Sequence, residues 1–275
     1  MNLLYSLGVK MKRIITTLIL ALPLCVMAQT NEFGASVGAS NYYGDLAPSI
    51  SIKEFHPQFG AFLKRNRASG FVSWKYEFNY ATISGSDRNF EKNNTRNLDF
   101  QSNLYEASIQ FEFNFQKFFI GLRAEKFSPY AFVGLGATYY NPQGTYNGNW
   151  VDLKPLSTEG QGLTGGPDQY SSMTTVIPMG GGFKWELGRR WNIYVYTGFR
   201  YSFSDYLDDV SGTYFDIAEI NERKGEVAAY MADKSDGQIF PEGKQRGNSQ
   251  RSDWYFFNGF SISYWLLDRN CFNFK

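Results

Sequence analysis

The stretch Leu104-Tyr105-Glu106-Ala107-Ser108-Ile109-Gln110-Phe111-Glu112-Phe113-Asn114-Phe115 decides the fold. From Tyr105 onward its odd-numbered positions carry apolar or aromatic side chains, and most of its even-numbered positions carry polar or charged ones. Only a β-strand places successive side chains on opposite faces, so this alternation predicts a strand with one apolar and one polar face.

Seven further segments support the same interpretation. Val72 to Tyr80 alternates without a miss, and six weaker versions follow the same pattern. Most of the eight segments are 9 to 13 residues long, which exceeds the ~5 to 6 residues of soluble strands and matches the ~9 to 11 that cross a tilted bilayer. The six weaker segments are Phe33 to Asn41, Phe59 to Lys64, Tyr130 to Tyr140, Thr175 to Leu187, Trp191 to Phe203 and Trp254 to Leu266.

The composition indicates whether the apolar face of the strands points toward lipid or into the barrel. The chain contains 25 Phe, 19 Tyr and 6 Trp, more rings than the narrow interior of an eight-stranded barrel easily holds. A soluble lipocalin-like or sandwich protein would have to pack them inside. We therefore expect the rings to face lipid and the ionic side chains to pair in the lumen, in an eight-stranded antiparallel transmembrane β-barrel of OmpA-like type. The mid-strand ionic residues are Lys75, Glu77, Glu106, Glu112, Lys184, Glu186 and Arg200.

The connections between the predicted strands alternate strictly between long and short. The long connections are residues 42–58, 84–103, 141–174 and 204–253, and the short ones are residues 65–70, 116–129 and 188–190. Short periplasmic turns and longer extracellular loops are typical of outer-membrane barrels. Within the last loop, the composition of Asp216 to Met231 favours a short helix over the barrel mouth.

The N-terminus predicts export. Basic residues Lys12 and Arg13 precede an apolar run from Ile14 to Met27, which is typical of a signal peptide cleaved after Ala28. Residues 1–28 are therefore expected to be the signal peptide, with either Met1 or Met11 as the start, and residues 29–275 the barrel domain. The mature chain would then keep Cys271 as its only thiol and form no internal disulfide.

Basic residues occupy the short turns. Arg65 and Arg67 lie in the first of them and Arg189 and Arg190 in the last. We take these four as a candidate docking rim for a periplasmic partner, against the simpler interpretation of solvated turns. A net charge of +1 gives no footprint for nucleic acid, so no nucleic-acid partner is expected.

Catalytic and metal-binding motifs are hard to find in the sequence. The single histidine, His56, precedes Pro57 and is expected to be a strand-entry residue. Asp205, Asp208 and Asp209 offer carboxylates that suit calcium, but their spacing does not match the 12-residue EF-hand loop, so an acidic loop is the alternative. No catalytic residue, cofactor, metal ion or small-molecule substrate is predicted.

Three segments resemble a known family. The opening strand and turn from Phe33 to Leu46, the strand from Gln58 to Arg65, and above all Asp205 to Tyr214 look like the PorG-type outer-membrane barrels associated with the type IX protein secretion system. That resemblance implies a non-enzymatic outer-membrane component that contacts the periplasmic ring of the secretion machine and helps to anchor it. It brings no catalytic residues. The chain departs from the usual terminal aromatic of barrels, because Lys275 follows Phe274.

The expected location is the outer membrane, with membrane lipid and periplasmic ring proteins as partners. Two alternatives remain open at this point. One is a small porin, and the other is an OmpA-like barrel that binds an extracellular partner through its long loops.

Overall fold

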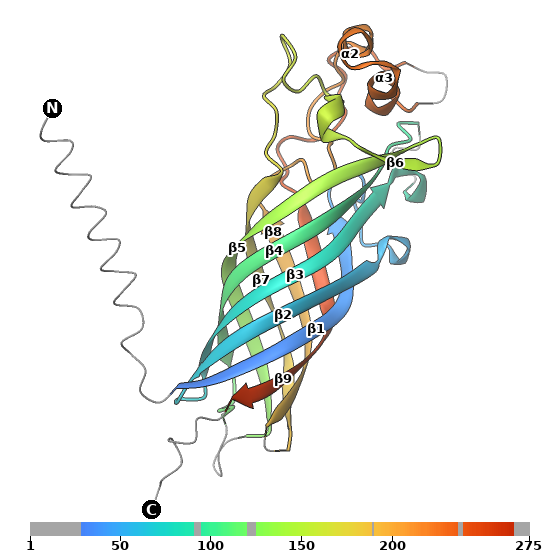
Figure 1. Cartoon of the computed structure of the whole chain (residues 1–275). Coiled ribbons are helices and arrows are strands. Elements are labelled where there is room, and N and C mark those ends of the chain that lie inside the picture. The colour runs from blue at the N-terminus through green and yellow to red at the C-terminus, as the bar shows by residue number, and fades with distance from the viewer. Residues whose placement is uncertain (1–28, 91–94, 120–124, 189, 236–238, 267–275) are drawn as a thin grey trace, which may run out of the picture.

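The computed structural model describes residues 29–90, 95–119, 125–188, 190–235 and 239–266. Within them the chain runs up and down as a meander of antiparallel strands (Figure 1). The strands are β1 (Gln29–Tyr43), β2 (His56–Arg67), β3 (Val72–Ser86), β4 (Asp99–Asn114), β5 (Phe127–Tyr146), β6 (Asn149–Asp152), β7 (Met173–Leu187), β8 (Trp191–Ser202) and β9 (Trp254–Leu266).

Eight of these strands close into a barrel. β1 pairs with both β2 and β9, so that Phe33 lies opposite Leu63 on one side and Tyr264 on the other. The pairing of β4 with β5 and of β5 with β7 completes the ring. Closure gives the edge strands partners, as the lipid interior requires. All eight predicted strands are confirmed. The short β6 adds a hairpin on the far end of β5 and takes no place in the ring.

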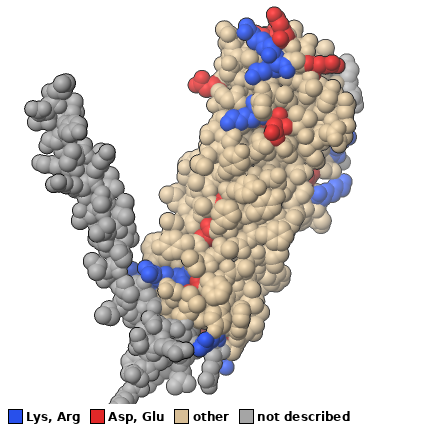
Figure 2. Space-filling view, viewed as in Figure 1, with Lys and Arg blue, Asp and Glu red and all other residues tan. Residues whose placement is uncertain are grey.

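The wall carries the predicted apolar face outward. Trp74 is 37% exposed and Phe111 is 36% exposed, whereas the intervening positions of β4, such as Gln110, are buried. Figure 2 shows that charged side chains gather toward the two ends of the molecule, while most of the wall between them on this face is uncharged. This is the surface that a bilayer requires of a transmembrane barrel.

The two ends of the barrel differ. The short turns, the start of β1 and the end of β9 lie at one end, which we call the short-turn end (Figure 1). The long connections build a cap at the other end, with helices α2 (Ile217–Lys224) and α3 (Glu226–Ala232) and the short 3-10 turns η1 (Ile52–Glu54), η2 (Asp87–Asn89) and η4 (Lys154–Leu156). The single helix predicted in the last loop is therefore two, because Gly225, at φ 89°, interrupts it.

Candidate functional site

The lumen is filled by side chains that neutralise one another. Glu112 on β4 accepts from Lys64 on β2 at 3.0 Å and from Lys184 on β7, and all three side chains are at most 2% exposed. One carboxylate therefore serves two buried ammonium groups. The three residues come from three different strands, and their side chains fill this part of the lumen.

Two further ion pairs continue the network. Arg200 lies 3.3 Å from Glu106, which also accepts from the Tyr255 hydroxyl at 2.7 Å. Lys75 pairs with Glu77 at 2.7 Å. The mid-strand ionic residues predicted to pair inside thus do so, except that Glu186 is only half-buried near the end of β7.

Glu32 is a lumen acid that the sequence did not point to. It accepts from Asn66 at 3.1 Å and Asn192 at 3.2 Å, and also from the hydroxyls of Tyr194 and Ser263. Glu32 was missed because it lies one residue before the predicted start of the first strand. The period-two pattern of β1, which puts Ser36 and Ser40 on the inner face, could have extended back to it.

The expectation that the rings face only lipid is wrong in part. Several aromatic rings on β2, β5, β8 and β9 lie in the lumen. Their hydroxyl groups or ring faces contact the ionic side chains there. Room for them comes from glycines: a side chain at Gly198 would meet the Phe132 ring at 2.8 Å. The buried rings on these four strands are Phe62, Tyr130, Phe132, Tyr140, Tyr194, Tyr196, Tyr255, Phe257 and Trp265.

The short-turn end collects the predicted rim arginines. Arg65 and Arg67 follow Leu63 on the outward-facing row at the end of β2, half-buried and exposed respectively. Arg190 precedes β8 and donates to the Tyr264 hydroxyl at 2.6 Å. Only β1 and β9 separate β2 from β8, so three gaps of about 4.8 Å put these groups roughly 14 Å apart along the wall. Arg189 lies outside the described residues.

The acidic motif of the last loop ties the cap to the barrel. The Tyr42 hydroxyl at the end of β1 lies 2.7 Å from Asp208 and 2.5 Å from Asp253. A phenol has a single proton, so one of the two carboxyls must supply its own. Burial, together with the neighbouring acids, raises the pKa of both Asp208 and Asp253, in agreement with this sharing.

Asp209 points away from that pair. It accepts from the hydroxyls of Thr158 at 2.5 Å and Tyr170 at 2.6 Å, and burial raises its pKa to about 6. Asp208 thus bonds to the end of β1, whereas Asp209 bonds to the connection between β6 and β7. Within the described residues, no three His, Cys, Asp or Glu side chains gather closely enough to hold a metal ion.

His56 is the first residue of β2, as its strand-entry interpretation predicted. Its Nε2 lies 2.6 Å from the Ser84 hydroxyl, which itself donates to Glu54. In a Ser-His-acid hydrolase the carboxylate orients the imidazole. Here Glu54 contacts the serine instead, so the three groups lack the order that makes a base of the histidine.

No helix in the described part of the chain combines the length and apolar character needed to cross a bilayer.

Comparison with solved structures returns small outer-membrane barrels. Neisserial surface protein A shares 8% identity at a TM-score of 0.38, over 86% of this chain and 95% of that one. Ail of Yersinia pestis shares 11% at 0.39, over 87% and 100%. The N-terminal barrel of Pseudomonas aeruginosa OprF shares 9% at 0.36, over 86% and 97%. At these scores the likeness carries no argument about function.

No protein with a curated description matches the sequence. A family model does match, over residues 11–221, which is most of the chain and includes seven of the eight barrel strands. The chain therefore belongs to the family described as "Domain of unknown function (DUF6089)".

Proposed function

We propose that this protein is a non-enzymatic outer-membrane barrel that anchors or scaffolds the periplasmic ring of the type IX protein secretion system. The short-turn end faces the periplasm in this proposal, and the cap faces the cell exterior. Short periplasmic turns and long extracellular loops are the usual arrangement in outer-membrane barrels.

The observation that carries the scaffold role is the filled lumen. Glu112 with Lys64 and Lys184, and Glu106 with Arg200, occupy the space through which a solute would have to pass. Opening it would leave buried charges without partners, at a cost of several kcal/mol. A barrel closed in this way suits an anchor better than a pore.

The rim supplies the docking surface. Arg65, Arg67 and Arg190 carry positive charge at the membrane edge of the short-turn end, where a periplasmic protein would meet the barrel. Arginine forks bind carboxylates through two parallel hydrogen bonds. An acidic surface on a ring protein is therefore the partner chemistry that this rim fits.

The test is affinity capture from detergent-solubilised outer membranes. We expect wild-type protein to retain the periplasmic ring proteins, and the variant with Arg65, Arg67, Arg189 and Arg190 all changed to Glu to lose them. The control reverses two charges at the opposite end, by changing Arg223 and Lys224 of α2 to Glu. Equal capture by both variants and wild type would exclude the rim, and absence of ring proteins from the wild-type capture would exclude the secretion role.

A surface-binding barrel is the second candidate function, and the cap favours it. The cap is bonded into one structure, with the buried Arg246 joined to Glu159 at 3.0 Å across two loops. Deletion of the gene separates the two candidates. Loss of secreted cargo supports the secretion role, and unchanged secretion supports surface binding.

A further inference from the structure

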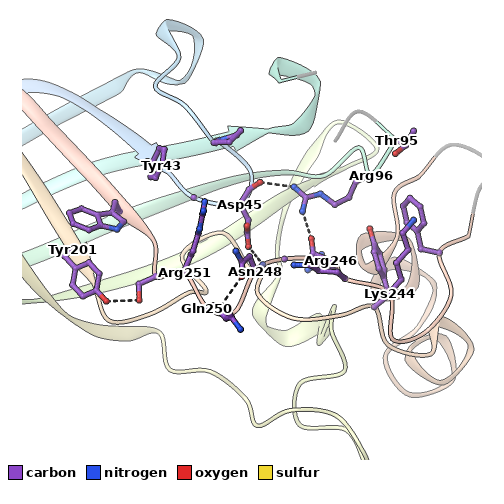
Figure 3. Close-up of a pocket in the computed structure, with 18 residues that line it drawn as sticks. Tyr43, Asp45, Thr95, Arg96, Tyr201, Lys244, Arg246, Asn248, Gln250 and Arg251 are labelled. Atoms are coloured by element: carbon purple, nitrogen blue, oxygen red, sulfur yellow. Dashed lines mark hydrogen bonds between the residues drawn. The ribbon is translucent and has the colours of Figure 1, made fainter. Parts of the chain in front are cut away.

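The cap contains a polar cavity of about 700 Å³, the cap pocket, between the first, second and last long connections (Figure 3). Asp45, Arg96, Tyr214, Lys244 and Arg251 line it. Tyr43, Tyr201 and Trp254, at the cap ends of β1, β8 and β9, form its edge nearest the barrel wall. Its volume lies within the ~300 to 1,000 Å³ range of small-molecule sites.

The pocket is held in shape by bonds among its own loops. Arg96 donates to the backbone carbonyls of Asp45, at 3.0 Å, and of Arg246, and its Nε bonds Asp87 at 2.8 Å. The Asn248 amide donates to the Asp45 carboxylate at 2.6 Å. Because these bonds lie within the protein, they hold the lining in place and reduce the ordering that binding would require.

One donor in the lining, the Tyr214 hydroxyl, has no acceptor among the described residues. The Tyr214 side chain is buried at 1% exposure, yet its hydroxyl has no hydrogen-bond partner in the described structure. Burial raises the pKa of Tyr214 to about 12, so the group stays a neutral donor at physiological pH. A buried donor without an acceptor is costly, and a bound acceptor would remove that cost.

Lys244 and Arg251 add two positive charges to the lining of the pocket. Neither forms an ion pair with a described acidic residue, and Lys244 lies 3.4 Å above the Phe240 ring. Figure 3 shows Arg251 beside Asp45 and Tyr201, with Lys244 on the other side of Arg246. Asp45 is the one acid in the lining, and its carboxylate already accepts from Asn248.

The position of the cap pocket and the chemistry of its lining together indicate which ligand it would bind. Trp254 packs on Tyr201 at 5.0 Å, and aromatic residues of this kind mark the level of the lipid headgroups in barrels. The cavity is larger than a phosphate ion needs, and combines ring faces with amide and cationic donors. We propose that the cap pocket binds a phosphate-bearing saccharide, with the headgroup of an outer-leaflet glycolipid as its source. The source, but not the pocket chemistry, rests on the membrane orientation proposed above.

Binding of the full chain in detergent micelles tests the proposal. The probes are a bisphosphorylated glucosamine-disaccharide glycolipid, the same glycolipid without phosphates, the deacylated bisphosphorylated disaccharide, and inorganic phosphate. We expect the phosphorylated glycolipid to bind most tightly. Changing Lys244 and Arg251 together to Ala should weaken it by about tenfold or more, and Tyr214→Phe by several-fold.

The matched control changes Arg223 and Lys224 of α2 to Ala, which removes equal charge from the same end of the molecule but outside the pocket. This variant should bind as wild type does. Thermal unfolding of all three variants checks that the cap remains folded. Tyr214→Phe keeps the ring that packs on Phe240 and loses only the hydroxyl.

Two results would overturn the proposal that the cap pocket binds a phosphorylated ligand. One is equal affinity of wild type and the Lys244 and Arg251 double variant, and the other is equal affinity for the glycolipid with and without phosphates. Equal binding of the deacylated disaccharide would keep the pocket and overturn its lipid source. Capture of periplasmic proteins by the double variant is an independent readout, so failure here and failure of the secretion proposal are distinguishable.

Discussion

Glu112 neutralises two lysines at once in a part of the lumen that is closed to water. Both Lys64 and Lys184 lie within salt-bridge distance of it, and neither has another described acidic partner at that distance. A buried charge that loses its partner costs far more than an exposed one. Single residues of the lumen therefore control the stability of the whole barrel.

Glu112→Gln should lower the free energy of unfolding by about 3 to 5 kcal/mol, because it leaves two buried ammonium groups facing a neutral amide. Urea-dependent refolding into lipid vesicles measures it. The control is Glu219→Gln on α2, whose pair with the exposed Arg223 is worth about 0.3 to 0.5 kcal/mol. A loss below about 1 kcal/mol for Glu112→Gln would contradict the role assigned to the lumen network.

The buried acids of the cap make its stability depend on pH. Burial raises the pKa of Asp209 to about 6 and of Asp205 to about 7, and raises those of Asp208 and Asp253 as well. A carboxyl with a raised folded pKa binds more protons folded than unfolded, so stability falls as pH rises from about 4 through these values.

Hydrogen exchange at residues 207–212, corrected for intrinsic rates, should therefore show stronger protection at pH 5 than at pH 8. Asp253→Asn, which removes one of the two acids around Tyr42, should reduce that difference. Glu219→Gln should leave it unchanged. Protection that increases from pH 5 to pH 8 would have the wrong sign for raised carboxyl pKa values.

At the level of elements, the alternating pattern predicted every barrel strand, but its prediction stopped short at the cap side of β1, β2, β3, β4, β5 and β7. The prediction for β3 ended at Tyr80, while the strand continues to Ser86. From Ala81 to Gly85 every residue is buried, because the cap covers both faces of the strand there. Where both faces of a strand are buried, apolar and polar residues need not alternate. A search for alternation therefore does not detect this part of β3.

The outward face of β4 offers a test of membrane contact. Ile109 is 50% exposed near the middle of the strand. Ile109→Arg should cost about 2 to 4 kcal/mol in vesicles, since an arginine near the bilayer midplane must reach water from the lipid side. Trp150→Arg on β6, in the hairpin beyond the ring, is the matched control and should cost about 0 to 1 kcal/mol. Equal costs, measured by the same refolding titration, would place Ile109 outside the bilayer.

For the whole molecule, the candidate site was partly within reach of the sequence. The alternation of turn lengths placed the rim arginines at one end, and the structure brings Arg65, Arg67 and Arg190 there. Which acid meets which cation in the lumen was out of reach, because it depends on the stagger of strands around the ring. The cap pocket was equally hidden, since its lining comes from three loops that only the folded cap brings together.

A closed lumen predicts an absence of conductance. Purified wild-type barrel in planar bilayers should give no resolved current steps, since ion pairs and rings fill its interior. A porin inserted into the same bilayers is the positive control. Stable steps that scale with salt concentration would favour the small porin and contradict the anchor role.

The central claim is that one set of rings faces lipid while the ionic side chains lie inside. Trp74 is 37% exposed and Trp265 is 1% exposed, and both lie within three residues of the short-turn ends of their strands. Two variants that each keep one of these tryptophans, with the other five changed to Phe, can be refolded into vesicles of brominated lipid. The account predicts strong quenching of Trp74 fluorescence and weak quenching of Trp265. Equal quenching, or stronger quenching of Trp265, would contradict it.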